Sequence, residues 1–219
     1  MNSTMLSSIG RKLAIALAGL FLMTFLVVHL GINLLLIKDD GGASFRAAAD
    51  FMAHNPVIQI FEIVLFLGFA LHILIGIILW IGNMLARGKG YKISNQSETT
   101  FFSKYMFHTG MIVLAFLILH FFNFYFVKEG WISPPEGIAH DDLYQMALLL
   151  FQNPVYSILY LLAFIFLGFH LNHAFQSAFQ TLGLEHTRYS RFIRGFGTFY
   201  ALVVSVGFAI IPLYFLFLY

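Results

Sequence analysis

The chain has 219 residues, of which 60% are hydrophobic and only 10% are charged, whereas a typical soluble domain has about 25% charged residues. The apolar stretches are continuous rather than alternating, which excludes an ordinary soluble domain and favours an all-α integral membrane protein over a β-barrel. The absence of cysteine excludes cysteine-ligated iron–sulfur clusters and thioether-linked haem in this chain. The formal net charge of +2 gives no indication of nucleic-acid binding.

Five apolar stretches are long enough to cross roughly 30 Å of hydrocarbon at about 1.5 Å per residue. The first follows a pair of basic residues, but its apolar run is longer than that of a signal peptide, so we interpret it as a retained span. We predict one domain over 1–219, with spans at about 11–37, 56–86, 103–127, 154–182 and 196–218. The intervening segments 44–54 and 141–151 are weakly amphipathic and are predicted to lie along the membrane surface.

Basic residues are distributed unequally between the two sides of the predicted spans. One side has Arg11, Lys12, Arg87, Lys89, Lys92, Lys104, Arg188, Arg191 and Arg194, and the other has Lys38, Arg46 and Lys128. By the positive-inside rule the N-terminus is predicted to be cytoplasmic and the C-terminus to be outside.

Two of the predicted spans begin at an Asn-Pro dipeptide, at 55–56 and 153–154. Asparagine is a preferred N-cap and proline suits the first helical position, so these dipeptides fix where the helices start. His72 and His170 each lie 16 residues after their proline. Both are therefore predicted at the same depth, about 24 Å from the outer helix end.

Two other histidines share a different depth. His29 lies nine residues before Lys38, and His120 lies eight residues before Lys128, which places both about 12–14 Å from the outer end of their spans. Each is preceded by a glycine at a distance of ten residues, Gly19 or Gly110. We interpret spans one and two against three and four as a diverged duplication, with the fifth span added.

Four histidines at two depths have the arrangement needed to hold two stacked b-type haems in a bundle of the first four spans. A haem iron takes two axial imidazoles, and facing helices can supply them. We predict His29 with His120 for the outer iron and His72 with His170 for the inner iron. The glycines near these ligands, Gly31, Gly76 and Gly168, are predicted to let a porphyrin approach the backbone.

Other roles for these histidines stay open. A histidine in a membrane span can simply form a hydrogen bond between helices. His173 competes with His170 because residues three apart share one side of a helix; the depth match favours His170, which leaves His173 to bind a haem propionate. Ser7 and Arg11 are further propionate candidates, although Arg11 also fits positive-inside anchoring alone.

Glu62 is the one acidic residue that falls deep within a predicted span. Burying a carboxylate there is costly, so such residues are functional candidates by default. It lies about 10 Å along its helix from the outer end, near the level of the outer haem. We predict that it relays a quinol proton or binds a quinone head group, the alternative being a bond to a neighbouring helix.

These residues lie in a chain that resembles the cytochrome b558 family of succinate dehydrogenase and fumarate reductase membrane anchors, the single-chain, five-helix, two-haem type. The resemblance covers nearly the whole chain, including "FLVVHLGINLL", "FEIVLFLGFALHILIG" and "FLILHFFNF". The most specific stretch is "GFHLNHAFQSAFQTLGL", which is similar to members from Bacteroidetes, apart from Ala174 where relatives usually have glycine. The family's ligand positions carry over to His29, His72, His120 and His170.

The resemblance implies a function that the histidines alone do not. It implies a chain in the bacterial inner membrane that anchors a flavoprotein and an iron–sulfur protein on the cytoplasmic face. It further implies electron exchange with menaquinone through two haems b, with FAD and iron–sulfur clusters only in the partner subunits. The chain would thus be the quinone-reacting subunit of an oxidoreductase, in a complex that can form a higher oligomer.

Two other interpretations remain. Another two-haem anchor, of the hydrogenase or formate dehydrogenase type, or a transmembrane ferric reductase, would use the same ligand chemistry with other partners. A transporter or proton channel using intramembrane histidines would contain no haem and would usually show broken helices at mid-membrane. The Asn-Pro pairs lie at predicted helix starts instead, which disfavours the transporter.

Overall fold

The computed structural model describes residues 7–86, 105–184 and 188–219, and every regular element among them is helical. Five helices are long and apolar enough to cross a membrane. They contain α1 (Ser8–Asn33), α3 (Pro56–Ala86), α5 (Met106–His120), α8 (Pro154–Thr181) and α9 (Ser190–Phe217), and the spans of α1 and α5 include the short helical segments that follow them. The short turn η2 (Leu34–Ile37) continues α1, while η3 (Phe121–Tyr125) and α6 (Phe126–Lys128) continue α5.

Five helices match the predicted spans, with one difference in the last of them, and the predicted start of the third span, at 103, lies outside the described residues. Helix α9 begins at Ser190, six residues before the predicted start at 196. The sequence places Arg191 and Arg194 there, and their charges suggested a loop. Basic side chains at the end of a span can instead extend to the aqueous boundary while the backbone stays helical. The orientation prediction relies partly on residues 87–104, which lie outside the described residues.

The Asn-Pro helix starts form as expected. The Asn153 side chain accepts a hydrogen bond from the Val155 backbone N–H at 2.9 Å, and Asn55 accepts one from Val57 at the same distance. Because both caps fix the first turn, α3 and α8 start in the same register. Residues equally far from the two prolines therefore lie at equal depth.

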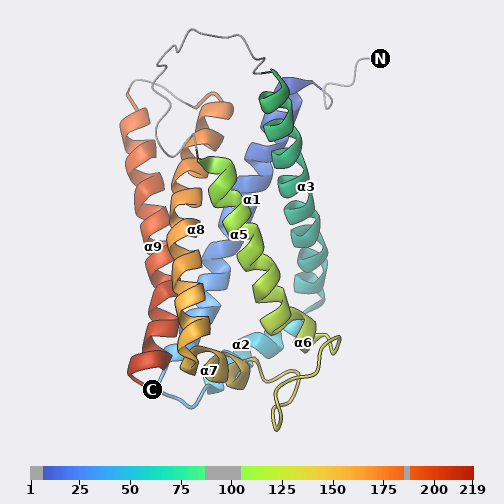
Figure 1. Ribbon diagram of the computed structural model, residues 1–219, viewed down its shortest axis with the longest axis vertical. Coiled ribbons are helices and arrows are strands. Elements are labelled where there is room, and N and C mark those ends of the chain that lie inside the picture. Colours follow the sequence, from blue (N-terminus) through green and yellow to red (C-terminus); the bar gives the residue numbers. More distant parts are fainter. Residues whose placement is uncertain (1–6, 87–104, 185–187) are drawn as a thin grey trace.

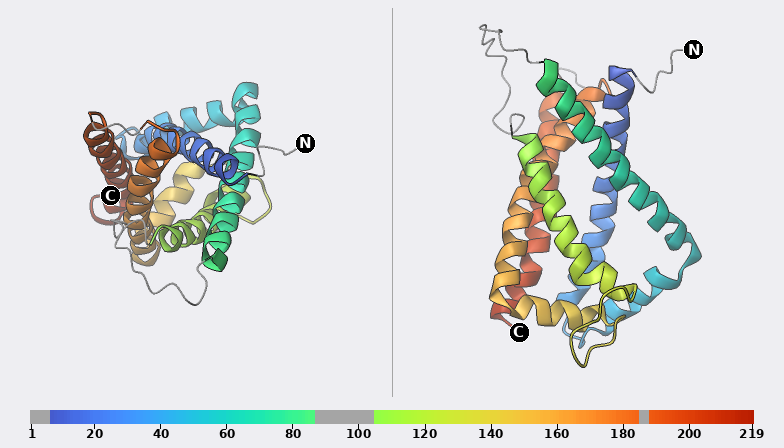
Figure 2. Two further views of the ribbon diagram at one scale, coloured as in Figure 1. Left: turned by 90° about the horizontal axis from the view of Figure 1, so that it is seen from above. Right: turned by 45° about the vertical axis from the view of Figure 1, so that its right-hand side comes forward.

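Four helices, α1, α3, α5 and α8, surround a central space, and α9 lies outside this ring against α8 (Figure 2). Small residues allow the close approach of α9. A Cβ at Gly168 of α8 would lie 2.7 Å from Ser205 Oγ, and one at Gly207 of α9 would lie 2.8 Å from Leu30 of α1. The Tyr200 hydroxyl also donates to the Met23 carbonyl of α1 at 2.7 Å. Helix α9 thus packs against one side of the ring, on α8 and α1.

Two short helices lie across the end of the bundle opposite to the N-terminus (Figure 1). They are α2 (Ala43–His54) and α7 (Leu143–Gln152), the amphipathic segments expected at the membrane surface. We call these two helices the end plate.

The two helices of the end plate are joined by an ion pair. The Arg46 guanidinium donates to both carboxylate oxygens of Asp142 at 3.0 Å and lies 4.7 Å from the centre of the Tyr144 ring. Burial opposes ionisation of Asp142, but its bonds from Arg46 and from the Gln145 backbone outweigh that effect, so its pKa is lowered. Gly42 has φ of 83° and a Cβ there would overlap Tyr144, so only glycine fits this turn.

Candidate functional site

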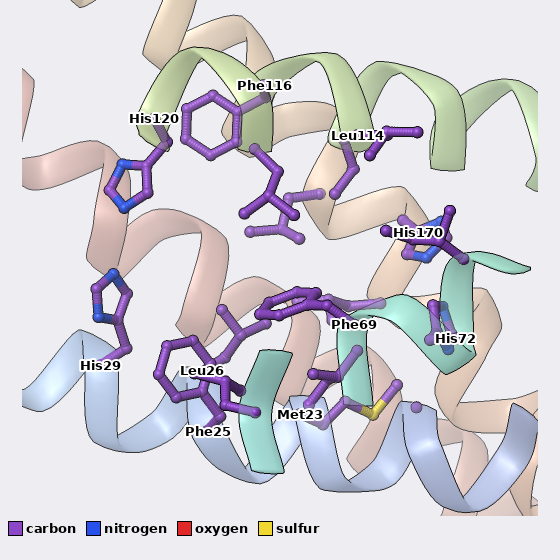
Figure 3. Close-up of a pocket in the computed structure, with 18 of the residues that line it drawn as sticks. Met23, Phe25, Leu26, His29, Phe69, His72, Leu114, Phe116, His120 and His170 are labelled. Atoms are coloured by element: carbon purple, nitrogen blue, oxygen red, sulfur yellow. The ribbon is translucent and has the colours of Figure 1, made fainter. Parts of the chain in front are cut away.

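The four histidines at two depths all line one cavity of about 2170 Å³ inside the helical ring. Typical pockets for single small ligands have roughly 300–1,000 Å³, so this space is large enough for two sizeable groups. Its walls are mainly apolar, with Phe69 and Phe116 among the side chains between the two histidine levels (Figure 3).

The plate-side pair consists of His29 from α1 and His120 from α5. Their ring centroids are 5.8 Å apart and the ring planes are almost perpendicular, at 85°. Aromatic rings surround them: Phe25 stacks on His29 at 5.1 Å, and Phe116 and Phe124 approach His120 at 5.9 and 5.2 Å. Both histidines therefore lie in an aromatic environment near the end plate.

The N-side pair, nearer the N-terminus, consists of His72 from α3 and His170 from α8. Their ring centroids are 6.3 Å apart with an interplanar angle of 80°. Each ring lies against the glycine of a neighbouring helix: a Cβ at Gly19 would lie 3.6 Å from His72 Cε1, and one at Gly110 would lie 3.3 Å from His170 Cε1. Larger residues at these two positions would press on the imidazoles.

Both pairs fit an iron held between two imidazoles. A metal that binds one nitrogen of each ring on opposite sides at about 2 Å holds the ring centroids roughly 6 Å apart. The 5.8 and 6.3 Å separations match this span. Within the described residues no cluster of three or more His, Asp or Glu side chains could hold a metal ion.

One of these imidazoles also has a buried nitrogen without a protein partner. Among the described residues, Nδ1 of His120 is buried without a hydrogen bond, whereas His72 interacts with the Ile15 backbone of α1. Buried polar atoms are normally paired, and exceptions point to a ligand or a special role. The unpartnered His120 nitrogen therefore fits a site whose imidazoles interact with a bound group.

The predicted carboxylate, Glu62, lies on α3 and lines the cavity at the plate end. It interacts with the Tyr125 hydroxyl of η3, and Phe66, one turn later on α3, packs on the Tyr125 ring at 5.1 Å. The η3 segment is a π-helical turn that directly follows His120; such turns often occur at functional sites. The sequence did not reveal this turn or the role of Tyr125.

The predicted propionate residues are separated by the structure. His173 lines the cavity one turn beyond His170 and is accompanied there by Lys12. Ser7 caps α1, accepting a bond from the Gly10 N–H at 3.0 Å. Neither Ser7 nor Arg11 is among the described residues that line the cavity.

The glycine prediction was partly wrong. Gly168 faces α9 rather than the cavity, since a Cβ there would meet Ser205 and the Ala201 carbonyl. Gly31 is exposed with no neighbour within 4 Å. Gly76 lines the cavity as expected. The sequence could not identify which helix face α9 would cover.

Comparisons with protein-family models, with curated proteins and with solved structures find no match for this chain. Function is therefore inferred from the histidine pairs, the cavity between them and the carboxylate at one end of that cavity.

Proposed function

We propose that this chain is a two-haem cytochrome b that anchors a succinate:quinone oxidoreductase, either a succinate dehydrogenase or a fumarate reductase. The observation that carries the haem assignment is the pairing of all four deep histidines at two levels, at separations of 5.8 and 6.3 Å. The assignment to this oxidoreductase class is supported by the family resemblance of the sequence. Within it, this chain would be the subunit that reacts with quinone.

The cavity supports a large apolar ligand. The space of about 2170 Å³ is at least twice that of an ordinary ligand pocket, and its lining is mainly apolar. A bulky, mostly apolar group is expected to fill it, and two haems b fit this description.

Each histidine pair would hold one haem. The haems would supply one-electron transfer, which the amino-acid side chains of this chain do not provide. His29 and His120 would bind one iron and His72 and His170 the other. Ten residues separate Gly19, beside His72, from His29 on α1, so the two levels lie about 15 Å apart along the bundle.

Glu62 would handle protons at the plate end. Oxidation of a quinol releases protons as well as electrons, and a carboxylate lining the cavity can accept one of them. Its neighbour Tyr125 can orient the carboxylate through their side-chain interaction. We place the quinone head group, menaquinone by resemblance, beside this pair and near the plate-side haem.

The proposed placement in the cell follows the distribution of basic residues. The N-side of the bundle would face the cytoplasm of a bacterium, and a flavoprotein and an iron–sulfur protein would bind there. Electrons would then pass between the iron–sulfur protein and the quinone by way of the N-side and plate-side pairs. The five apolar helices make the chain a multi-pass membrane protein.

The test is a reduced-minus-oxidised spectrum of the purified full-length chain or complex, with haem b measured per chain. Two low-spin haems per chain are expected, and none would overturn the haem assignment. Co-purification of a flavinylated subunit, together with haem reduction by succinate, would identify the complex. Haems without such a subunit, but with a hydrogenase or formate dehydrogenase partner, would favour the other anchor class.

A further inference from the structure

Thr109 of α5 lies beside the imidazole of His170 at the N-side level. Its Oγ1 is 3.4 Å from His170 Nδ1 and 2.9 Å from the Met106 carbonyl oxygen one turn earlier in its own helix. The next residue, Gly110, leaves room for the same ring edge, since a Cβ there would lie 3.7 Å from Nδ1. The Nδ1 edge of His170 thus lies on the turn that contains Thr109.

The shorter contact decides the direction of the hydrogen bonds. A threonine hydroxyl has one proton to donate and two lone pairs that accept. Because the carbonyl of Met106 can only accept, the proton of Thr109 belongs to that 2.9 Å bond. Towards His170 the hydroxyl can then only accept, and its partner must be an Nδ1–H.

This contact selects one tautomer of His170. In a neutral imidazole one nitrogen carries the proton and the other offers a lone pair. With the proton held on Nδ1, the lone pair is on Nε2. A metal-binding histidine needs a free lone pair on one nitrogen, and a partner for its other N–H fixes both the tautomer and the ring orientation.

We propose that Thr109 is a positioning residue that accepts the Nδ1 proton of His170 and so keeps the Nε2 lone pair available for the N-side iron. The inference rests on the proposed two-haem function and deepens it. It assigns to the Thr109 hydroxyl the orientation of His170, at the opposite end of the cavity from the proposed quinone site.

The other half of the molecule provides an internal comparison. An offset of 91 residues matches Thr109 and Gly110 with Ala18 and Gly19. Alanine has no hydroxyl, and the ring of His72, which lies against Gly19 of α1, interacts instead with the backbone of Ile15 on the same helix. A hydroxyl thus lies beside His170, whereas the equivalent position beside His72 is Ala18 and has none.

The plate-side pair has no such acceptor either. Nδ1 of His120 is unpartnered within the described part of the chain. The neighbour of His29 Nδ1 is the amide nitrogen of Asn33 at 3.4 Å, which is a donor already anchored to the His29 carbonyl at 2.7 Å. A donor cannot accept Nδ1–H, so Asn33 does not select the same tautomer.

The experiment compares Thr109→Val, which keeps the shape but removes the hydroxyl, with Thr109→Ser, which keeps the hydroxyl. Thr24→Val is the matched control, because Thr24 also lines the cavity and bonds its own helix carbonyl, Leu20, at 3.0 Å, but within the described part of the chain it has no hydrogen bond to a histidine. All are prepared as the full chain in its complex. Haem transfer to excess apomyoglobin and a potentiometric titration of the haems are then measured.

Thr109→Val is expected to release one haem of the two about 10- to 100-fold more readily, as usual for loss of a partner to a ligand histidine. The potential of that haem should become more positive, because a less basic imidazole stabilises oxidised iron less. Thr109→Ser and Thr24→Val should match the wild type. Unchanged release and potentials in Thr109→Val, or a Thr109→Ser variant that behaves like it, would overturn the inference.

The outcome for the wild type separates the two proposals. If the wild-type chain carries no haem, the proposed function fails and the role of Thr109 fails with it. If the wild type carries two haems and Thr109→Val retains both unaltered, only the role of Thr109 fails. Repeating the measurement in a His120→Leu background, which should retain the N-side haem alone, tests whether the affected haem is the one beside His170.

Discussion

The two histidine pairs have nearly the same separation but very different surroundings. The N-side rings lie against glycines, with Thr109 beside one of them. The plate-side rings are surrounded by phenylalanines, and a π-helical turn follows His120 directly. The cavity wall at the plate end also contains the Glu62 carboxylate.

The difference suggests a division of labour along the bundle. An imidazole pair supported by close backbone and a hydroxyl is suited to hold a group firmly. The plate-side pair lies near a carboxylate and a tyrosine hydroxyl that can exchange protons. Electron storage at one level and proton-coupled chemistry at the other would follow from these surroundings.

The largest expected effect is the loss of one whole haem. His120→Leu should remove only the plate-side haem and His170→Leu only the N-side haem, because each substitution removes one of two proposed axial ligands. Haem b per chain should fall from two to one in each variant. His54→Leu is the control, since His54 lies on the end plate beside Asp50. Loss of both haems in each single variant would show that the levels are not independent.

The next effect concerns Glu62 and should be confined to the plate end. Glu62→Gln keeps the shape but cannot accept a proton, so quinone turnover should fall about 100-fold, in the range typical of a lost general base. Both haem spectra should be unchanged. Glu136→Gln, in the loop before α7, is the control. Full turnover in Glu62→Gln would assign this carboxylate a purely structural role.

A smaller effect should distinguish the two glycines of the N-side pair. In Gly110→Ala the new Cβ would lie 3.3 Å from His170, whereas in Gly19→Ala it would lie 3.6 Å from His72, which is ordinary contact. Gly110→Ala should therefore lower the free energy of unfolding more, by about 1–3 kcal/mol as for other overpacked sites. Thermal unfolding with the haem spectrum as the signal measures this.

Gly82→Ala provides the reference for both variants, because nothing lies within 4 Å of a Cβ at that position. Alanine also favours a helix over glycine by up to about 1 kcal/mol, and the reference variant reports that gain alone. Equal stabilities of Gly110→Ala and Gly82→Ala would show that the His170 ring moves aside without cost.

The smallest effect is the pH dependence of the end plate. The pKa of Asp142 is lowered, because its bonds from Arg46 and Gln145 outweigh the effect of burial. The ion pair therefore stabilises the fold at neutral pH, and this contribution is lost as the pH falls through the lowered pKa, below about 4. The pair is partly exposed, so the change should be less than about 1 kcal/mol.

Asp142→Asn isolates the charge, since asparagine also serves as an N-cap for α7. At neutral pH the wild type should unfold at a higher temperature than Asp142→Asn. The two unfolding temperatures should become equal at acidic pH, once Asp142 of the wild type is protonated. A constant difference across the whole range would mean that the charge of Asp142 contributes nothing.

Most of the fold could be predicted because the depth of a residue in a helix follows from the number of residues between it and the helix start. A fixed rise per residue and two Asn-Pro starts are enough to place four histidines at two depths and to pair them. The start of α9 and the orientation of Gly168 were missed, because both depend on how helices pack against one another. The same holds for the π-helical turn after His120 and for Tyr125 beside Glu62.

The contact of Thr109 with His170 was missed for a different reason. A threonine within an apolar span is common, and its own helix can satisfy the hydroxyl. The available signal was the mismatch with Ala18 at the offset of 91 residues. Only the packing of α5 against α8 brings Thr109 into contact with His170.

The interpretation of the chain as a duplication also relates the two members of each histidine pair by symmetry. His29 and His120 occupy matching places in the halves, as do His72 and His170, which lie equally far from Pro56 and Pro154. A two-fold axis that runs along the bundle and exchanges the halves therefore passes between the two members of each pair. A flat group on that axis meets equivalent side chains on its two faces, and Thr109 opposite Ala18 is one position at which the faces differ.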